Sequence, residues 1–157
     1  MALQPVQDRR DQTQVPGGMK LHQYANLYFH ARNPMMYKRQ TEVANLCVLR
    51  VSINVLRIGG AAITDQNAAS SYVRFLAPQQ WSVLDFDDIF AMDWNHPDDQ
   101  IRHWRHKSRK CAEALVPHAV EPRFVIGAYV ADQTAAALIT AVAPKLRVVI
   151  NPILFFR

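Results

Sequence analysis

The chain has 157 residues, of which 50% are hydrophobic and 20% are charged, and this composition excludes collagen-like, coiled-coil and wholly disordered proteins. At this length folding buries about 70% of the surface that the unfolded chain exposes, so we expect one domain that needs no disulfide staples. Eighteen Lys and Arg against thirteen Asp and Glu leave a net charge of +5, which bears on the partners of the protein but not on its fold.

The predicted elements begin after a polar segment. Residues 1–20 are predicted to form a tail or a helix remnant that ends in a Pro-Gly-Gly turn, and the folded domain is expected to span residues 21–157. Pro34 suits the first turn of a short helix with Met35, Met36 and Tyr37 as its body. Aromatic and β-branched runs predict strands at residues 26–31, 46–53 and 61–64.

The rest of the chain predicts further helices and strands. Thr64 or Asp65 can cap a helix that runs to Tyr72, and residues 87–94 are expected to form a short helix. The mixed order of elements indicates an α+β domain with a central, largely antiparallel or mixed sheet. Apolar runs predict strands at residues 112–117, 124–130 and 146–150, with an alanine-rich helix at residues 133–142 that Asp132 caps.

The cysteines and the apolar segments predict the compartment. Cys47 and Cys111 are the two cysteines of the chain, and the first twenty residues contain no apolar run typical of a secretory leader. No later stretch reaches the roughly 18 apolar residues that a membrane span needs. We therefore expect a soluble protein in the reducing environment of the cytoplasm.

Charge is distributed unevenly in the segment before residue 113. Six aspartates lie between Asp85 and Asp99 with no basic residue among them. Five basic residues follow with no acidic one: Arg102, Arg105, Lys107, Arg109 and Lys110. A solvated helix face with local ion pairs explains such a pattern. A basic cluster that also holds tryptophan and histidine is typical of a polyanion-binding surface as well.

Several kinds of site find little support. The pairs Gly17-Gly18 and Gly59-Gly60 lack the residues that a phosphate-binding loop requires after them, and no nucleophile elbow is present. His103, His106 and Cys111 are a weak signal for a zinc site, which needs three or four well-spaced ligands, and the neighbouring basic residues would repel a dication. We therefore expect no metal.

Two charged residues stand at the ends of apolar strands. Glu113 opens the apolar run ALVP and follows the five basic residues, and Arg32 follows the run NLYFHA. Each is either an ordinary strand-edge residue or a site residue that the sheet holds rigidly, and position alone favours the edge residue for Glu113. The guanidinium fork of Arg32 also matches a diphosphate.

Four sequence runs occur in an order that is typical of one protein family. They are YANLYFHARNPMMY at residues 24–37, ITDQNAAS at 63–70, AMDWNHPDD at 91–99 and KCAEALVP at 110–117. Through these runs the chain resembles the DarT family, the DNA ADP-ribosyltransferase toxins of bacterial toxin–antitoxin pairs. The resemblance covers about residues 15–157 and implies an ADP-ribosyltransferase-like mixed or antiparallel sheet with short flanking helices.

The resemblance also implies a site, a co-substrate and partners. Glu113 matches the catalytic glutamate of the family and Arg32 its essential NAD-contacting arginine, while Tyr28, Met35 and Tyr37 are expected to line the NAD site. The acceptor is a base in single-stranded DNA, because pairing blocks the reacting ring nitrogen, and a macrodomain antitoxin is the implied protein partner. The residues expected to bind DNA lie shortly before the glutamate: Trp94, Arg102, Trp104, Arg105, Lys107, Arg109 and Lys110.

Two alternatives stay open. A protein-modifying ADP-ribosyltransferase or an NAD glycohydrolase would use the same Glu113 and Arg32. Family members usually begin with a further segment that contains a His-x-Thr type motif, and this sequence starts after it. The expectation is a longer native protein or a truncated form, and a truncated form would be a non-catalytic module that binds nucleic acid.

Overall fold

The computed structural model describes residue 8 and residues 10–156, which belong to two compact units. The first unit takes the chain up to His30 and from Asn54 to Val120, and the second takes Ala31 to Ile53 and the chain from Glu121 onward. Each unit contains one β-sheet with short helices. The α+β class and the antiparallel or mixed pairing predicted from the sequence are therefore confirmed, with the strands divided between two sheets.

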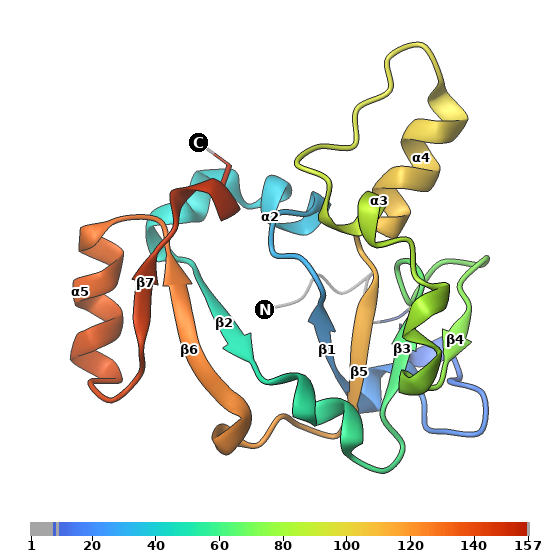
Figure 1. Cartoon of the computed structure of the whole chain (residues 1–157), viewed down its shortest axis with the longest axis horizontal. Coiled ribbons are helices and arrows are strands. Elements are labelled where there is room, and N and C mark those ends of the chain that lie inside the picture. Colours follow the sequence, from blue (N-terminus) through green and yellow to red (C-terminus); the bar gives the residue numbers. More distant parts are fainter. Residues whose placement is uncertain (1–7, 9, 157) are drawn as a thin grey trace. The chain divides into compact units, whose positions relative to one another are not determined.

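The sheet of the first unit has four antiparallel strands in the order β1-β5-β3-β4 (Figure 1). Strand β1 pairs with β5 along its whole length, and the register sets Tyr28 opposite Glu113. Residues that are far apart in the sequence therefore meet at one end of this strand pair. The strands span Tyr24–Tyr28 (β1), Glu113–Pro117 (β5), Ala62–Thr64 (β3) and Phe75–Leu76 (β4).

The two faces of this sheet carry different cores, because side chains alternate between the faces along each strand. One buried cluster includes residues from before β1 and from the turn after β3: Val15, Leu21, Tyr24, Ala68 and Leu115. A second buried cluster includes residues of α3 and of the segment before it: Ile63, Leu84, Ile89 and Ala112. Glu113 stands two residues before Leu115, so its side chain projects on the face of the first cluster.

Two helices of the first unit lie between β4 and β5 in the sequence, α3 (Phe86–Phe90) and α4 (Gln100–Arg109) (Figure 1). Asp85 caps α3 and Asp99 caps α4, each by accepting the backbone amide three residues further on, at 3.1 and 2.8 Å. Such caps satisfy amides that the first helical turn leaves unbonded. The helix predicted at residues 87–94 is thus shorter than expected, and α4 is an addition to the predicted elements.

The sheet of the second unit is mixed, in the order β2-β6-β7, with β2 antiparallel and β7 parallel to β6. These strands span Cys47–Val51 (β2), Val125–Val130 (β6) and Val148–Ile150 (β7). Helix α5 (Gln133–Val142) joins the two parallel strands, and it has the predicted bounds and the predicted Asp132 cap. Val43, Ala131 and Phe155 form a buried cluster in this unit.

Short helical elements complete the described part of the chain. Helix α2 (Pro34–Lys38) has the proline at its first position as predicted. No helix within residue 8 and residues 10–156 is long and apolar enough to cross a membrane. The 3-10 helices span Leu21–Gln23, Gln40–Asn45, Ile53–Arg57, Pro78–Val83, Pro122–Phe124 and Pro152–Leu154.

The helix predicted between Thr64 and Tyr72 is wrong, because residues 65–72 form turns. The Asp65 carboxylate accepts the Arg74 backbone amide at 2.9 Å instead of capping a helix. The Ala68 amide donates to the side chain of Glu113. The Asp65 carboxylate and the Ala68 amide thus bond to residues outside the segment, and neither serves as a cap or as a donor within a helix.

The described part of the predicted tail is packed. Val15 is 4% exposed and belongs to the first buried cluster. The turn that follows has Gly17 at a φ of +67°, a conformation that favours glycine. Ordered structure therefore begins before residue 21, the predicted start of the domain, whereas residues 1–7 and 9 lie outside the described residues.

Candidate active site

Glu113 is the first residue of β5 and is 2% exposed. The Asn26 side-chain amide donates to its Oε2 at 2.6 Å, the Arg10 guanidinium donates to the same oxygen at 3.2 Å, and the Ala68 backbone amide donates to Oε1 at 3.0 Å. These contacts fix the direction of both oxygens. Because all three partners are donors, the arrangement suits the ionised carboxylate.

The strand register explains how this set of donors forms. Tyr28 lies directly opposite Glu113, and Asn26 precedes Tyr28 by two residues on β1, so all three side chains project from one face of the sheet. Strand β3 lies on the other side of β5, and the Thr64 hydroxyl accepts the Glu113 backbone amide at 3.0 Å. The turn after β3 then brings the Ala68 amide to the carboxylate.

Burial raises the pKa of the Glu113 carboxyl above its ordinary value, while the Arg10 charge and the donors of Ala68 and Asn26 act in the opposite direction. Burial and then the Glu113 carboxyl raise the pKa of the Tyr28 phenol, so its hydroxyl stays protonated at neutral pH. A carboxyl with a raised pKa loses its negative charge at a higher pH than an ordinary glutamate. As the pH is lowered, a reaction that needs this charge should therefore lose its rate at a higher pH than a reaction that depends on an ordinary glutamate.

Two consecutive backbone amides connect Glu113 with the end of α4. The Asn67 amide donates to the Ser108 carbonyl at 3.0 Å, and the next amide, of Ala68, donates to Glu113 at 3.0 Å. The same turn thus contacts both the helix that carries the basic residues and the carboxylate.

Arg32 lies in the second unit, where residues near the C-terminus hold it. Its Nη1 donates to the carbonyls of Ile153 and Phe155 at 2.9 and 3.1 Å. The guanidinium carbon lies 3.9 Å from the centre of the Phe156 ring, and the Tyr37 ring meets Phe156 edge-on at 5.1 Å. Carbonyls and an aromatic face therefore fix the guanidinium plane.

Met35 and Tyr37 lie on α2 in the second unit and are 39% and 49% exposed. The Asn33 side chain caps this helix by accepting the amides of Met35 and Met36 at 2.9 and 3.0 Å. Accessible side chains are what a ligand-lining role requires, and that role stays a prediction for both residues.

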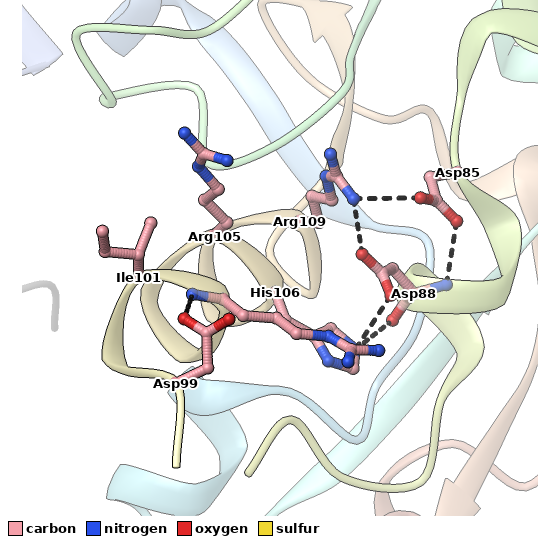
Figure 2. A pocket seen from close by; sticks show the side chains of 8 residues that line it. Asp85, Asp88, Asp99, Ile101, Arg105, His106 and Arg109 are labelled. Atoms are coloured by element: carbon pink, nitrogen blue, oxygen red, sulfur yellow. Dashed lines mark hydrogen bonds and ion pairs between the residues drawn. The ribbon is translucent and has the colours of Figure 1, made fainter. Parts of the chain in front are cut away.

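Helix α4 carries most of the basic run, and a pocket of about 570 Å³ lies beside it (Figure 2). Arg109 donates to the carboxylates of Asp85 and Asp88 at 3.0 and 2.7 Å. Figure 2 shows that the Arg105 side chain points away from these two carboxylates. The pocket is lined by residues of both charges: Asp85, Asp88, Asp99, Ile101, Arg102, Arg105, His106 and Arg109. Because Arg102, Arg105 and Lys107 are exposed, they are accessible to an external phosphate.

Lys110 was expected from the sequence to bind phosphate, but its side chain is buried. It is 0% exposed. Its Nζ donates to the carbonyls of Ile89 and Ala91 at 2.9 and 2.5 Å and lies 2.8 Å from Nδ1 of His30. The end of α3 supplies the carbonyls that draw the ammonium inward, so Lys110 fastens α4 to α3 and does not face solvent.

The two tryptophans that were expected to stack on a base differ in exposure. Trp104 lies on α4 and is 63% exposed, whereas Trp94 is half-buried in the loop before this helix. An exposed indole can stack on a nucleic-acid base. Trp104 therefore fits the expected role better than Trp94.

Within residue 8 and residues 10–156, no group of three or more His, Cys, Asp and Glu side chains could hold a metal ion. His106 is buried and lies with Nδ1 2.9 Å from Nε2 of His96 and with its own Nε2 3.0 Å from the Asp88 carbonyl oxygen. Nε2 faces a carbonyl oxygen and therefore donates to it, and in a neutral ring Nδ1 is then the acceptor for His96. His106 thus packs α4 against α3.

Arg10, Asn26 and Phe156 are among the residues that contact the expected site residues and were not predicted from the sequence. The signal for Asn26 was its spacing of two from Tyr28 within a strand, which places both on one face. For Arg10 the sequence offered an indirect signal. Val15 is an apolar residue directly before a Pro-Gly-Gly turn, so it indicates that the otherwise polar segment around Arg10 packs against the domain.

Comparisons with known proteins found one matching family, a curated relative and several solved structures. A sequence model of the family described as "DarT: ssDNA thymidine ADP-ribosyltransferase, DarT" matches residues 1–156. A curated relative from Thermosipho africanus (strain H17ap60334), "DNA ADP-ribosyl transferase-DNA ADP-ribosyl glycohydrolase fusion protein", is 30% identical over 124 residues. The alignment covers 74% of this chain, which spans only 30% of the length of that relative.

Two solved structures of a protein from Thermus sp. 2.9 share the fold. "Thermus sp. 2.9 DarT in complex with ADP-ribosylated ssDNA" has a TM-score of 0.83 at 23% identity, over 99% of this chain and 80% of that chain. "Thermus sp. 2.9 DarT in complex with NAD+" has a TM-score of 0.75 at 23% identity, over 94% of this chain and 81% of that chain. At these identities the likeness establishes the fold.

Proposed function

The chain belongs to the DarT family, and on that basis we propose that it transfers ADP-ribose from NAD to a thymidine base in single-stranded DNA. The observation that carries the proposal is the buried Glu113 carboxylate, whose two oxygens are held by three donors at the start of β5. Thymidine is proposed as the target because the description of the family names it.

Glu113 is proposed as the catalytic carboxylate. NAD supplies the ADP-ribosyl group, and nicotinamide is the leaving group. Positive charge develops on the ribose carbon as that bond breaks, and a carboxylate beside the carbon stabilises the charge. Within hydrogen-bond reach the same carboxylate can accept the proton of the attacking base nitrogen. The contacts from Asn26, Arg10 and Ala68 support these roles because they orient the carboxylate before substrate binds.

Arg32 is proposed to hold the diphosphate of NAD or the adjacent ribose. A guanidinium binds phosphate through two parallel hydrogen bonds, and the contacts with Phe156 and two carbonyls fix its plane. A fixed co-substrate makes attack by the base effectively intramolecular. Tyr28, Met35 and Tyr37 are proposed to line the binding site for NAD.

Single-stranded DNA is proposed to bind along α4. Arg102, Arg105 and Lys107 are exposed there and would contact phosphates, and Trp104 would stack on a base for about 1–3 kcal/mol. The contacts of the turn at residues 65–72 with both α4 and Glu113 support a DNA path that begins on this helix.

A labelling experiment tests the proposed reaction. The purified protein is incubated with NAD and with two oligonucleotides that differ in a single thymidine, and the products are analysed by mass spectrometry. We expect one added ADP-ribosyl group on the oligonucleotide with thymidine and none on the other. Equal labelling of both would contradict the target base, and labelling of protein alone would favour a protein-modifying enzyme.

The salt dependence of DNA binding tests the role of α4. Replacing Arg105 and Lys107 by Ala should make the slope of log affinity against log salt shallower, since each phosphate contact contributes about 0.7 to the slope for a single strand. We expect a loss of about one to two such contacts, measured by fluorescence anisotropy, and nearly unchanged NAD affinity. Replacing Lys145 and Arg147, exposed in the second unit, is the matched control. Equal slopes for the parent and the Arg105/Lys107 variant would remove α4 from the DNA path.

A partner follows from the proposed product. The name of the Thermosipho africanus relative joins a DNA ADP-ribosyl transferase with a DNA ADP-ribosyl glycohydrolase. We propose that a macrodomain glycohydrolase acts as antitoxin to this chain and removes ADP-ribose from the modified DNA.

A further inference from the structure

Thr64, the last residue of β3, connects the backbone of Glu113 with the turn that follows β3. It is 0% exposed, and its hydroxyl accepts the Glu113 backbone amide at 3.0 Å while it donates to the Gln66 carbonyl at 2.7 Å. We propose that Thr64 is a positioning residue, which sets the turn at residues 65–72 so that the Ala68 amide meets the Glu113 carboxylate. Its effect on catalysis rests on the function proposed above.

The regular pairing of β3 with β5 ends just before Thr64. The last backbone pair sets Ile63 opposite Ala114, and at the next position the Glu113 amide donates to the Thr64 side chain. The hydroxyl thus supplies the acceptor that a backbone carbonyl supplies along a regular ladder. The chain can therefore leave the sheet at Thr64 without an unpaired amide in the interior.

The direction of the Thr64 hydroxyl proton follows from two distances. A hydroxyl has one proton to donate, and the Gln66 carbonyl at 2.7 Å is closer to it than the Glu113 carbonyl at 3.4 Å. The proton therefore points to Gln66, and a lone pair accepts the Glu113 amide. Because both contacts need the same oxygen, a side chain without a hydroxyl loses both.

A second contact holds the turn at the end of α4. The Asn67 amide donates to the Ser108 carbonyl at 3.0 Å. The next residue, Ala68, is 0% exposed, and its amide donates to Oε1 of Glu113 at 3.0 Å. Ala68 thus lies in a turn that is held on both sides, and Thr64 is the side chain through which a substitution can loosen it.

Loss of the Ala68 contact has a defined sign. The Ala68 amide lowers the pKa of the Glu113 carboxyl, because it donates to the charged form. Without this donor the pKa should rise, and the acid limb of the activity profile should move to a higher pH. A Thr64 substitution leaves unchanged the titratable and charged groups around the carboxylate and the turn, which include Arg10, Tyr28, Cys111, Asp65 and Arg74.

The experiment uses the full chain with Thr64→Val, which keeps the shape of the side chain and removes the hydroxyl. The Ala68 amide signal is followed by nitrogen-15 NMR across pH, because an amide that donates to a carboxylate responds when the carboxylate is protonated. Glu113→Gln identifies which part of this response comes from Glu113 and which from Asp65. The pH dependence of kcat and of KM for NAD is measured on the same samples.

Further variants complete the design. Thr64→Ser keeps the hydroxyl and should restore the behaviour of the parent. Thr140→Val, in α5 of the second unit, is the matched control, because the Thr140 hydroxyl also donates to a carbonyl, that of Ala136 at 2.8 Å. Thr64→Cys, whose thiol is only a weak donor and acceptor, replaces Thr64→Val if circular dichroism shows that the latter does not fold.

We expect the response of the Ala68 amide to Glu113 to shrink in Thr64→Val and the midpoint of the acid limb to rise by about one pH unit. We expect kcat at neutral pH to fall about tenfold and KM for NAD to change little. An unchanged Ala68 response, an unchanged kcat, or equal changes in Thr140→Val would overturn the proposal. So would a fall in kcat that thermal melts explain by unfolded protein alone. A changed Ala68 response in a protein without transferase activity would retain the positioning role and contradict the proposed function instead.

Discussion

Replacing Glu113 by Gln should abolish the transfer of ADP-ribose to DNA while leaving the fold intact. The substitution keeps the size of the side chain but removes the negative charge that we propose stabilises the developing positive charge on the ribose. Removal of one preorganised electrostatic group costs about 10²- to 10³-fold in rate, and loss of proton acceptance by the same residue should add to this. An NAD-dependent DNA-labelling assay together with circular dichroism measures both parts of the expectation.

The choice of Gln over Ala follows from the burial of the site. Glu113→Ala should also be inactive, but it leaves a cavity and three donors without an acceptor, which lowers stability on its own account. Glu121→Gln, at an exposed position outside the site, controls for the loss of one carboxylate. Full labelling by Glu113→Gln would remove this residue from the mechanism.

Replacing Arg32 by Ala should weaken NAD binding far more than replacing Arg57 by Ala. A charge-assisted contact contributes about 1.5–3 kcal/mol, so the dissociation constant should rise by roughly 10- to 150-fold. Arg32→Lys should fail as well, because an ammonium reproduces neither the two-pronged contact nor the stacking on Phe156. Isothermal titration calorimetry with NAD measures the three affinities.

A stability measurement separates binding from folding in this series. Arg32→Ala also leaves the carbonyls of Ile153 and Phe155 without their donor, so some loss of stability accompanies the loss of affinity. Thermal melts of each variant without NAD report that part. Equal NAD affinities for the Arg32 and Arg57 variants would contradict the assignment of Arg32.

Local signals predicted the elements that depend on local contacts. The helix at residues 133–142 has its predicted bounds because a side-chain cap at Asp132 and a run of alanines suffice to define it. The apolar run that starts at Glu113 formed a strand within one residue of its predicted start. The resemblance to a family singled out Glu113 and Arg32, and their roles stay predictions that the variants above test.

Contacts between distant residues account for what the sequence did not predict. Residues 65–72 have the capping and alanine pattern of a helix, yet the Ala68 amide bonds to Glu113 in another strand. Lys110 belongs to a basic run that suggests a surface, yet the carbonyls at the end of α3 draw it inside. Arg10 stands in a polar segment, yet Val15 of the same segment packs into the first buried cluster.

The donors around Glu113 also determine when activity can arise during protein synthesis. Arg10, Asn26 and Ala68 are separated from the glutamate by 103, 87 and 45 residues along the chain. Loops of this length close late in folding, because their entropy is lost before distant contacts compensate for it. A ribosome-bound chain therefore has no assembled carboxylate site until β5 has been made and has paired with β1. For an enzyme proposed to modify the DNA of its own cell, unfinished chains are harmless.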